Sequence, residues 1–114
     1  MLPRSARLTS PDDFARTTKS GFRVTSKSLV GYLYLSSTVE PAKCGLIISK
    51  SVGGSVVRHR RARQIRHAIT PHLHLIPSGG LLVLRALPGS FALDIPGELS
   101  RLIPKLLQKS AVVG

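Results

Sequence analysis

A dense run of arginines in the middle of the chain constrains its fold more than any other feature. Directly after a Gly-Gly step, nine residues hold five arginines: Arg58, Arg60, Arg61, Arg63 and Arg66. Guanidinium groups this close repel one another unless they face water or a polyanion. Arginine suits phosphate because its planar group donates two parallel hydrogen bonds. The segment therefore indicates a nucleic-acid backbone as partner.

The charge of the whole chain indicates the same kind of partner. Its 114 residues include 17 Lys and Arg against 5 Asp and Glu, a formal net charge of +12. Such an excess destabilises a compact chain through self-repulsion, which a polyanion offsets. The length corresponds to one domain, and the 42% hydrophobic content favours a folded domain over a disordered basic tail. We therefore expect residues 1–114 to form a single domain, in which residues 1–9 are an extended basic arm.

An acidic membrane surface is the other general candidate for a polyanionic partner. However, no stretch approaches the ~20 apolar residues of a membrane span, and no basic region precedes an apolar signal-peptide core. The single cysteine, Cys44, excludes an internal disulfide and fits a reducing compartment. These features predict a cytoplasmic protein without a membrane partner.

The hydrophobic pattern predicts alternating helices and strands. Seven elements are expected in the order α-β-β-β-α-β-α: 11–19, 23–25, 29–36, 44–50, 55–70, 81–87 and 94–107. Ser10 and Pro11 form a typical helix start, and Gly21 would end the first helix. Pro104 should kink the last helix or delay its start. We therefore expect an α+β domain with a loop at 72–80.

The second helix is predicted to be amphipathic, with cations on its polar face. At ~100° per residue, one arc collects the apolar side chains Val57, Ala62, Ile65, Ala68 and Ile69. The opposite side collects His59, Arg60, Arg63, Arg66 and His67. A solvated face normally mixes Glu with Lys, whereas residues 51–88 contain no acidic residue. Contact with nucleic acid therefore explains this face better than solvation does.

The Gly53-Gly54-Ser55 step before this helix has two interpretations. It can cradle a phosphate at the helix N-terminus, where backbone N–H groups converge. It can equally be a plain turn, because the GxxxxGK[ST] spacing of a phosphate-binding loop is absent.

The chain lacks the patterns of a metal site or a catalytic site. No CxxC or HExxH motif and no nearby carboxylate accompanies the four histidines, His59, His67, His72 and His74. Metal-dependent phosphodiester hydrolysis needs converging carboxylates. The chain has only Asp12, Asp13, Glu40, Asp94 and Glu98. All but Glu40 fall at predicted helix starts, so we expect no catalytic residue and no metal site in the protein.

Base stacking is the remaining chemistry that the sequence offers. Phe14 and Tyr32 are able to share one surface with the basic Lys19, where an exposed ring would stack on a base. Both rings are equally compatible with a role in the core.

At this point the sequence resembles the protein subunit of bacterial ribonuclease P. The signature of that family, G-N-A-V-x-R-N-R-x-K-R-x-x-R, lies on its second helix after a strand that ends in S-K. Here Ser49-Lys50 leads into residues 53–66, GGSVVRHRRARQIR. The N-terminal family pattern R-L-x-x-x-x-D-F is also matched, by Arg7-Leu8 and Asp13-Phe14. The departures from the family pattern are His59 and Gly54, each in place of Asn, Ala62 in place of Lys, and Thr18 at a usually apolar or aromatic position.

The resemblance implies a two-layer α/β sandwich with a left-handed β-α-β crossover. It also implies an RNA-binding domain that assists a catalytic RNA in removing 5′ leaders from precursor tRNA, as part of an endoribonuclease. Catalysis is expected on the RNA, which would also hold most of the Mg²⁺. The implied partners are the catalytic ribonuclease P RNA and precursor tRNA, and not DNA.

The resemblance further implies two binding surfaces. Contacts to the catalytic RNA are expected from Lys50, Arg58, His59, Arg60, Arg61, Arg63 and Arg66. The single-stranded 5′ leader would lie in a cleft floored by the sheet and edged by the first helix, lined by Phe14, Lys19 and Tyr32.

Two other classes of protein remain open from the residues alone. A ribosomal-type structural protein or RNA chaperone would also use a basic helix. A DNA-binding module is a weaker alternative, because recognition helices usually mix Asn, Gln and Ser among their arginines.

Overall fold

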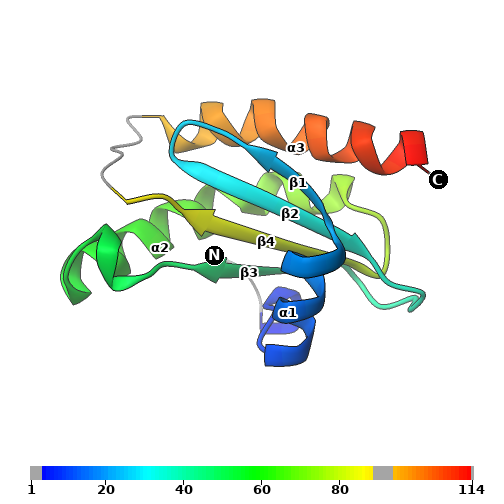
Figure 1. Cartoon of the computed structure of the whole chain (residues 1–114), viewed down its shortest axis with the longest axis horizontal. Helices are drawn as coiled ribbons and strands as arrows, with labels where there is room; N and C mark the ends of the chain where they lie inside the picture. Colours follow the sequence, from blue (N-terminus) through cyan, green and yellow to red (C-terminus); the bar gives the residue numbers. More distant parts are fainter. Residues whose placement is uncertain (1–3, 89–93, 114) are drawn as a thin grey trace.

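The computed structural model describes residues 4–88 and 94–113 (Figure 1). The helices and strands are, in chain order, α1 (Pro11–Ser20), β1 (Phe22–Thr25), β2 (Leu29–Leu35), β3 (Lys43–Ile47), α2 (Ser55–Ile69), β4 (Gly80–Ala86) and α3 (Ile95–Val113). Short 3-10 helices lie at Arg4–Ala6, Lys50–Val52 and Thr70–Leu75. The expected α+β class and the order α-β-β-β-α-β-α are confirmed. None of the described helices is long and apolar enough to cross a membrane.

The described strands form one sheet in the order β1-β2-β4-β3. β2 pairs antiparallel with both β1 and β4, whereas β3 and β4 run parallel and are joined through α2. In Figure 1, α2 passes behind the sheet between these two strands, which makes the crossover left-handed. This hand is unusual, because roughly 98% of such connections are right-handed. It agrees with the hand that the family resemblance implies.

One face of the sheet is covered by α2 and α3 and holds the larger part of the core (Figure 1). Fully buried side chains come from both layers: Leu29, Leu33, Leu82, Leu84, Ile65, Ile69, Leu99, Leu102, Ile103 and Leu106. Gly31 permits the close approach of α3 to β2, because a Cβ there would lie 2.6 Å from Cδ2 of Leu102.

The opposite face is covered only in part, by α1 and by the segment that precedes it. A second cluster of buried side chains forms there: Leu8, Val30, Tyr32, Leu81 and Val83. The ring of Phe14 lies over Gly45, where a Cβ would clash with the ring carbon Cζ. The part of this face that α1 does not cover is called the open sheet face below.

The N-terminal segment differs in part from the extended arm expected for residues 1–9. Arg4–Ala6 form a 3-10 turn, and the N–H of Leu8 donates to the carbonyl of Cys44 at 3.0 Å. Ala6 and Leu8 are buried. The segment from residue 4 onward therefore packs along the edge of β3, while residues 1–3 lie outside the described part.

Three further expectations need correction. Residues 72–80 are not simply a loop, because Thr70–Leu75 continue α2 as a 3-10 helix. The strand expected at 44–50 ends at Ile47. Pro104 does not delay α3, which runs unbroken from Ile95 with the proline ring on its exposed side.

Glu98 is not the helix cap that its position suggested. Its side chain is 5% exposed and accepts hydrogen bonds from the backbone N–H of Ser28 (2.9 Å) and from the Ser28 hydroxyl (2.7 Å). The cap of α3 is Asp94, whose Oδ1 accepts from the N–H of Gly97 at 3.0 Å. Glu98 thus ties α3 to the loop between β1 and β2.

Candidate nucleic-acid interface

The start of α2 depends on one glycine. Gly53 has φ +156° and ψ −173°, a backbone conformation that is essentially restricted to glycine. A Cβ there would also come within 2.9 Å of Cβ of Val57. Gly54 is extended, has open space around it, and precedes the helix without a side-chain cap. The turn therefore directs α2 outward from the end of β3.

The first half of α2 projects beyond the sheet, and only its second half is buried. Ile65, Ala68 and Ile69 are in the core, whereas Val57, expected on the same apolar arc, is 40% exposed. Among the candidate RNA-binding residues, Lys50, His59, Arg60 and Arg63 are exposed, and Arg58, Arg61 and Arg66 are half-buried. A helix that projects in this way presents cations on several sides.

A hollow of about 860 Å³ brings several of these cations together. It is lined by Arg7, Val56, His59, Arg60, Arg63, Arg66 and His67. We call this surface the α2 hollow. Its α2 side chains come from successive turns of one helix, while Arg7 comes from the segment paired with β3. No carboxylate lines it, so the hollow suits the phosphates of a nucleic-acid backbone.

A smaller hollow of about 300 Å³ adjoins the first, between α2 and the end of β3. Arg58 lines it with Leu46 and Ile48, and His59 and Arg66 line both hollows. The Nε of Arg58 is buried and has no hydrogen-bond partner among the described residues. Lys50 and Arg61 line neither hollow.

Three of the acidic residues are engaged away from this surface. In the described part of the chain, ion pairs join Arg16 to Asp13 (3.9 Å) and Lys43 to Glu40 (3.5 Å). Both pairs lie near α1 and the loop before β3, and Glu98 is engaged by Ser28. Among the described residues, no ion pair joins a cation of α2 to a carboxylate, so these cations remain available to a ligand.

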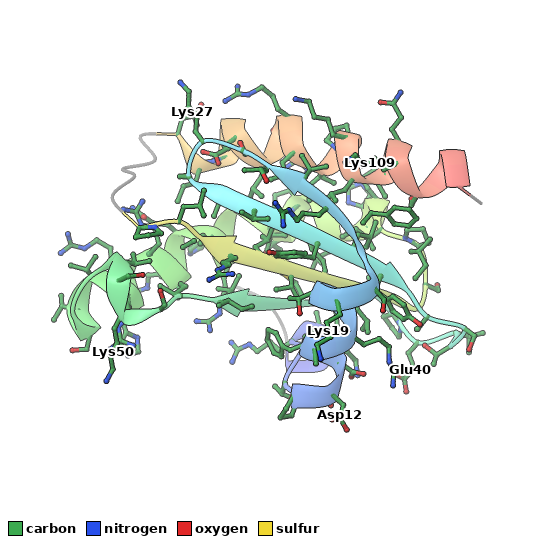
Figure 2. The ribbon with its side chains drawn as sticks, in the orientation of Figure 1. Asp12, Lys19, Lys27, Glu40, Lys50 and Lys109 are labelled. Carbon is green, nitrogen blue, oxygen red and sulfur yellow. The ribbon has the colours of Figure 1, made fainter. Side chains whose placement is uncertain are left out.

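The three candidate leader-binding residues lie on or beside the open sheet face. Lys19 is exposed on α1 (Figure 2), and Phe14 is half-buried over Gly45. Tyr32 is only 7% exposed and packs in the cluster with Val30 and Val83. The structure thus brings the two rings into one cluster, with little of the Tyr32 ring available for stacking.

Three arginines that sequence reasoning did not select belong to these surfaces. Arg7 lines the α2 hollow, while Arg23 and Arg85 point to the open sheet face, since they pair with Tyr32 and Val30. The sequence could have indicated Arg85 as a functional residue, because it is the one charged residue within the apolar run LLVLRAL. Arg7 was marked only by its place in the R-L-x-x-x-x-D-F pattern, because the α2 residues that line the hollow with it are 49 or more positions away in the sequence.

The described residues hold no group of three or more His, Cys, Asp and Glu side chains able to bind a metal ion. His67 and His72 both line a groove between α2 and α3, and the carboxylates of Asp13, Glu40 and Glu98 are engaged elsewhere.

Comparison with known proteins decides between the classes that this geometry allows. The sequence model of the Ribonuclease P family matches residues 2–110. The chain belongs to this family. The family supports the role of an RNA-binding component in tRNA processing, within an endoribonuclease holoenzyme.

Relatives and solved structures agree with the assignment. The chain is 38% identical to the ribonuclease P protein component of Acidothermus cellulolyticus, with 95% of this chain and 93% of that protein covered. It is 43% identical over 96 residues to the component from Mycobacteroides abscessus, covering 79% and 76%. The Staphylococcus aureus RNase P protein superimposes with a TM-score of 0.78 at 24% identity, over 90% of this chain and 98% of that one. This last likeness shows the shared fold.

Proposed function

We propose that the chain is the protein subunit of ribonuclease P, which helps a catalytic RNA to remove the 5′ leader of precursor tRNA. The observation that carries the proposal is the α2 hollow, in a chain whose family match spans residues 2–110. Relatives over nearly the whole length are named as ribonuclease P protein components. A ribosomal or chaperone role, or binding to DNA, would leave this match unexplained.

The catalytic RNA is the proposed partner of α2. Two RNAs that meet repel each other through their phosphates, and the cations of the hollow reduce this repulsion where they lie between the two. The projection of α2 beyond the sheet supports this role, because it gives a folded RNA access to several sides of the helix. Arg7 would add one phosphate contact from outside the helix.

The open sheet face is the proposed site of the leader. Lys19, Arg23 and Arg85 supply charge around a floor of apolar and aromatic side chains. Because Tyr32 is mostly buried, the leader would contact the edge of this ring and the exposed part of Phe14, and would not stack on Tyr32. This arrangement favours contact with the phosphates over readout of particular bases.

Cleavage chemistry is assigned to the RNA. In the part of the chain that the structure describes, the carboxylates do not gather into a metal site: Asp13 and Glu40 pair with cations, Asp94 caps α3, and Glu98 bonds to Ser28. This donor set does not fit a resident Mg²⁺, so the ions needed for hydrolysis would be held mainly by the RNA. The protein then acts by binding and positioning, in the cytoplasm, where precursor tRNA is made.

Cleavage of a precursor tRNA at low Mg²⁺ tests the proposal. Three mixtures are compared: the protein alone, the cognate ribonuclease P RNA alone, and both together. We expect cleavage only in the complete mixture. Cleavage by the protein alone would contradict the assignment of catalysis, and a lack of stimulation would favour the ribosomal or chaperone alternative.

The role of the α2 hollow is tested by replacing Arg60 with Ala. Loss of one phosphate contact should weaken binding to the catalytic RNA. The slope of log K against log salt concentration should become shallower by roughly 0.7–0.9. Arg101→Ala is the matched control, because it removes the same charge from an exposed position on α3. Filter binding over a salt series measures both. Equal effects of the two substitutions would show that only total charge matters.

A further inference from the structure

A second basic groove lies on the molecule, between β1 and α3. It encloses about 750 Å³ and is lined by Phe22, Arg23, Val24, Thr25, Lys105, Gln108 and Lys109. We call it the β1–α3 groove. Figure 2 shows Lys109 on α3 beside β1, at the opposite edge of the sheet from β3. The groove is therefore separate from the α2 hollow.

The lining of this groove suits a single strand of nucleic acid. Phe22 and Val24 are half-buried and form an apolar floor, and the cationic heads of Lys105 and Lys109 stand above it on exposed positions. β1 is an edge strand, so part of its backbone faces the groove. One of its carbonyls, that of Arg23, accepts from the Nζ of Lys109 at 2.8 Å. This bond orients Lys109 and leaves the other two ammonium protons for a ligand.

No carboxylate lines the β1–α3 groove. The one acidic residue within α3 is Glu98, and it is buried against Ser28. The charges of Lys105 and Lys109 consequently add to the self-repulsion of a chain with a formal charge of +12. A polyanion in the groove would offset that cost.

The groove borders the open sheet face at β1. Arg23 lines the groove and also pairs with Tyr32 across β1 and β2, which places its side chain on the open face. A strand that crosses this face and passes over β1 therefore meets Arg23 and then reaches Lys105 and Lys109. The α2 hollow lies toward the other edge, at β3, so a catalytic RNA bound there need not reach this groove.

We propose that the β1–α3 groove binds the phosphate backbone of the 5′-distal part of the precursor leader, after the leader has crossed the open sheet face. The inference rests on the proposed function and extends it. Binding in the β1–α3 groove gives the holoenzyme a preference for precursors whose leader is long enough to pass β1. Recognition is by charge, because the groove offers cations and an apolar floor and few groups that distinguish bases.

Binding of two precursors to the reconstituted holoenzyme tests the inference. One has a leader that ends on the sheet face, and the other has a long leader. We expect the wild-type holoenzyme to bind the long leader more tightly. Lys105→Gln should reduce this advantage and make the slope of log K against log salt concentration shallower by roughly 0.7 for the long leader. Its affinity for the precursor with the short leader should not change. The matched control is Arg101→Gln, which removes one charge from α3 outside the groove.

The outcomes separate the inference from the proposed function. If Lys105→Gln and Arg101→Gln behave alike, the groove has no specific role and the inference is overturned. If the wild-type protein does not stimulate cleavage by the RNA at all, the proposed function fails, and the inference with it.

Crosslinking identifies which RNA occupies the groove. The single cysteine is buried, so Gln108→Cys supplies one accessible thiol for an aryl azide. Irradiation of the holoenzyme with precursor should crosslink this position to distal leader nucleotides, and Arg101→Cys should do so far less. Crosslinks from position 108 to the catalytic RNA alone would overturn the inference.

Discussion

At the scale of single residues, Cys44 shows how the core controls the chemistry of one group. Its side chain is 2% exposed, on the face of β3 that α2 and α3 cover. Burial raises the pKa of the thiol from 9.0 to about 12, and the positive charge of Arg66 acts in the opposite direction. The thiol is therefore protonated in the folded protein and shielded from reagents.

This pKa predicts how stability changes in alkaline solution. Because the folded pKa lies above the unfolded value, the unfolded chain loses its thiol proton first as the pH rises. The free energy of unfolding should thus fall between pH 9.0 and about 12, by up to about 1.4 kcal/mol per pH unit from this group. Urea unfolding of the wild type and of Cys44→Ala, on either side of pH 9.0, measures this fall in the free energy of unfolding.

The difference between the two pH profiles isolates the thiol, because every other titrating group is common to both proteins. A native thiol that reacts with a disulfide reagent as fast as in urea would contradict the burial of Cys44. Equal slopes in the two proteins would contradict the raised pKa.

At the scale of elements, the turn before α2 decides where the arginines point. Gly53→Ala should cost about 1–3 kcal/mol of stability, since Ala is strained at this backbone conformation and its Cβ meets Val57. Gly54→Ala is the matched control, because that position is extended and open. Urea unfolding measures the cost, and binding to the catalytic RNA measures any displacement of α2.

If Gly53→Ala unfolds at the same urea concentration as Gly54→Ala, the turn tolerates a side chain and does not fix the direction of the helix. A loss of stability without a loss of RNA affinity would show that α2 recovers its position once RNA is bound.

Local pattern was sufficient for the element order. Ser10, Pro11 and Gly21 marked both ends of α1, and the Ser10 hydroxyl does accept from the N–H of Asp13. The apolar residues of β2 occur at both odd and even positions, a pattern typical of a strand covered on both faces, and Leu29–Leu33 are all buried. These features depend on neighbours within a few positions, which is why the sequence reveals them.

Features that depend on distant contacts were not predictable in the same way. Periodicity placed Val57 and Ile65 on one arc, but only Ile65 has the sheet beneath it. Glu98 resembled a cap because its partner, Ser28, lies seventy positions away. Arg7 reaches the α2 hollow only because its neighbour Leu8 is hydrogen-bonded to β3. The family resemblance supplied the two surfaces that the local pattern could not locate.

At the scale of the whole molecule, the described basic surfaces lie at both edges and on one face of the sheet. The molecule measures 37 × 25 × 25 Å, whereas electrostatic interactions are screened over about 8 Å at physiological ionic strength. Charges at the two edges are thus largely independent of each other. Arg60 and Arg63, which both line the α2 hollow, are separated by only about 4.5 Å along α2, so repulsion within the α2 hollow is the stronger contribution.

Salt should consequently affect folding and RNA binding in opposite directions. Added NaCl screens the repulsion among the cations and should raise the free energy of unfolding, while it weakens binding to the catalytic RNA. Urea unfolding and filter binding over one NaCl series measure both. NaCl is preferable to a sulfate salt, which stabilises folded proteins by exclusion from their surface.

The variant in which Arg60 and Arg63 are both replaced by Gln locates the effect. With two of the neighbouring charges removed, the gain in stability with salt should shrink, and the salt dependence of RNA binding should shrink with it. Both changes have one cause, because the side chains that destabilise the free protein are those that neutralise phosphate in the complex. If the gain in stability persists in this variant, the repulsion lies elsewhere in the molecule. If the wild-type protein loses stability as NaCl is added, its few ion pairs outweigh the repulsion.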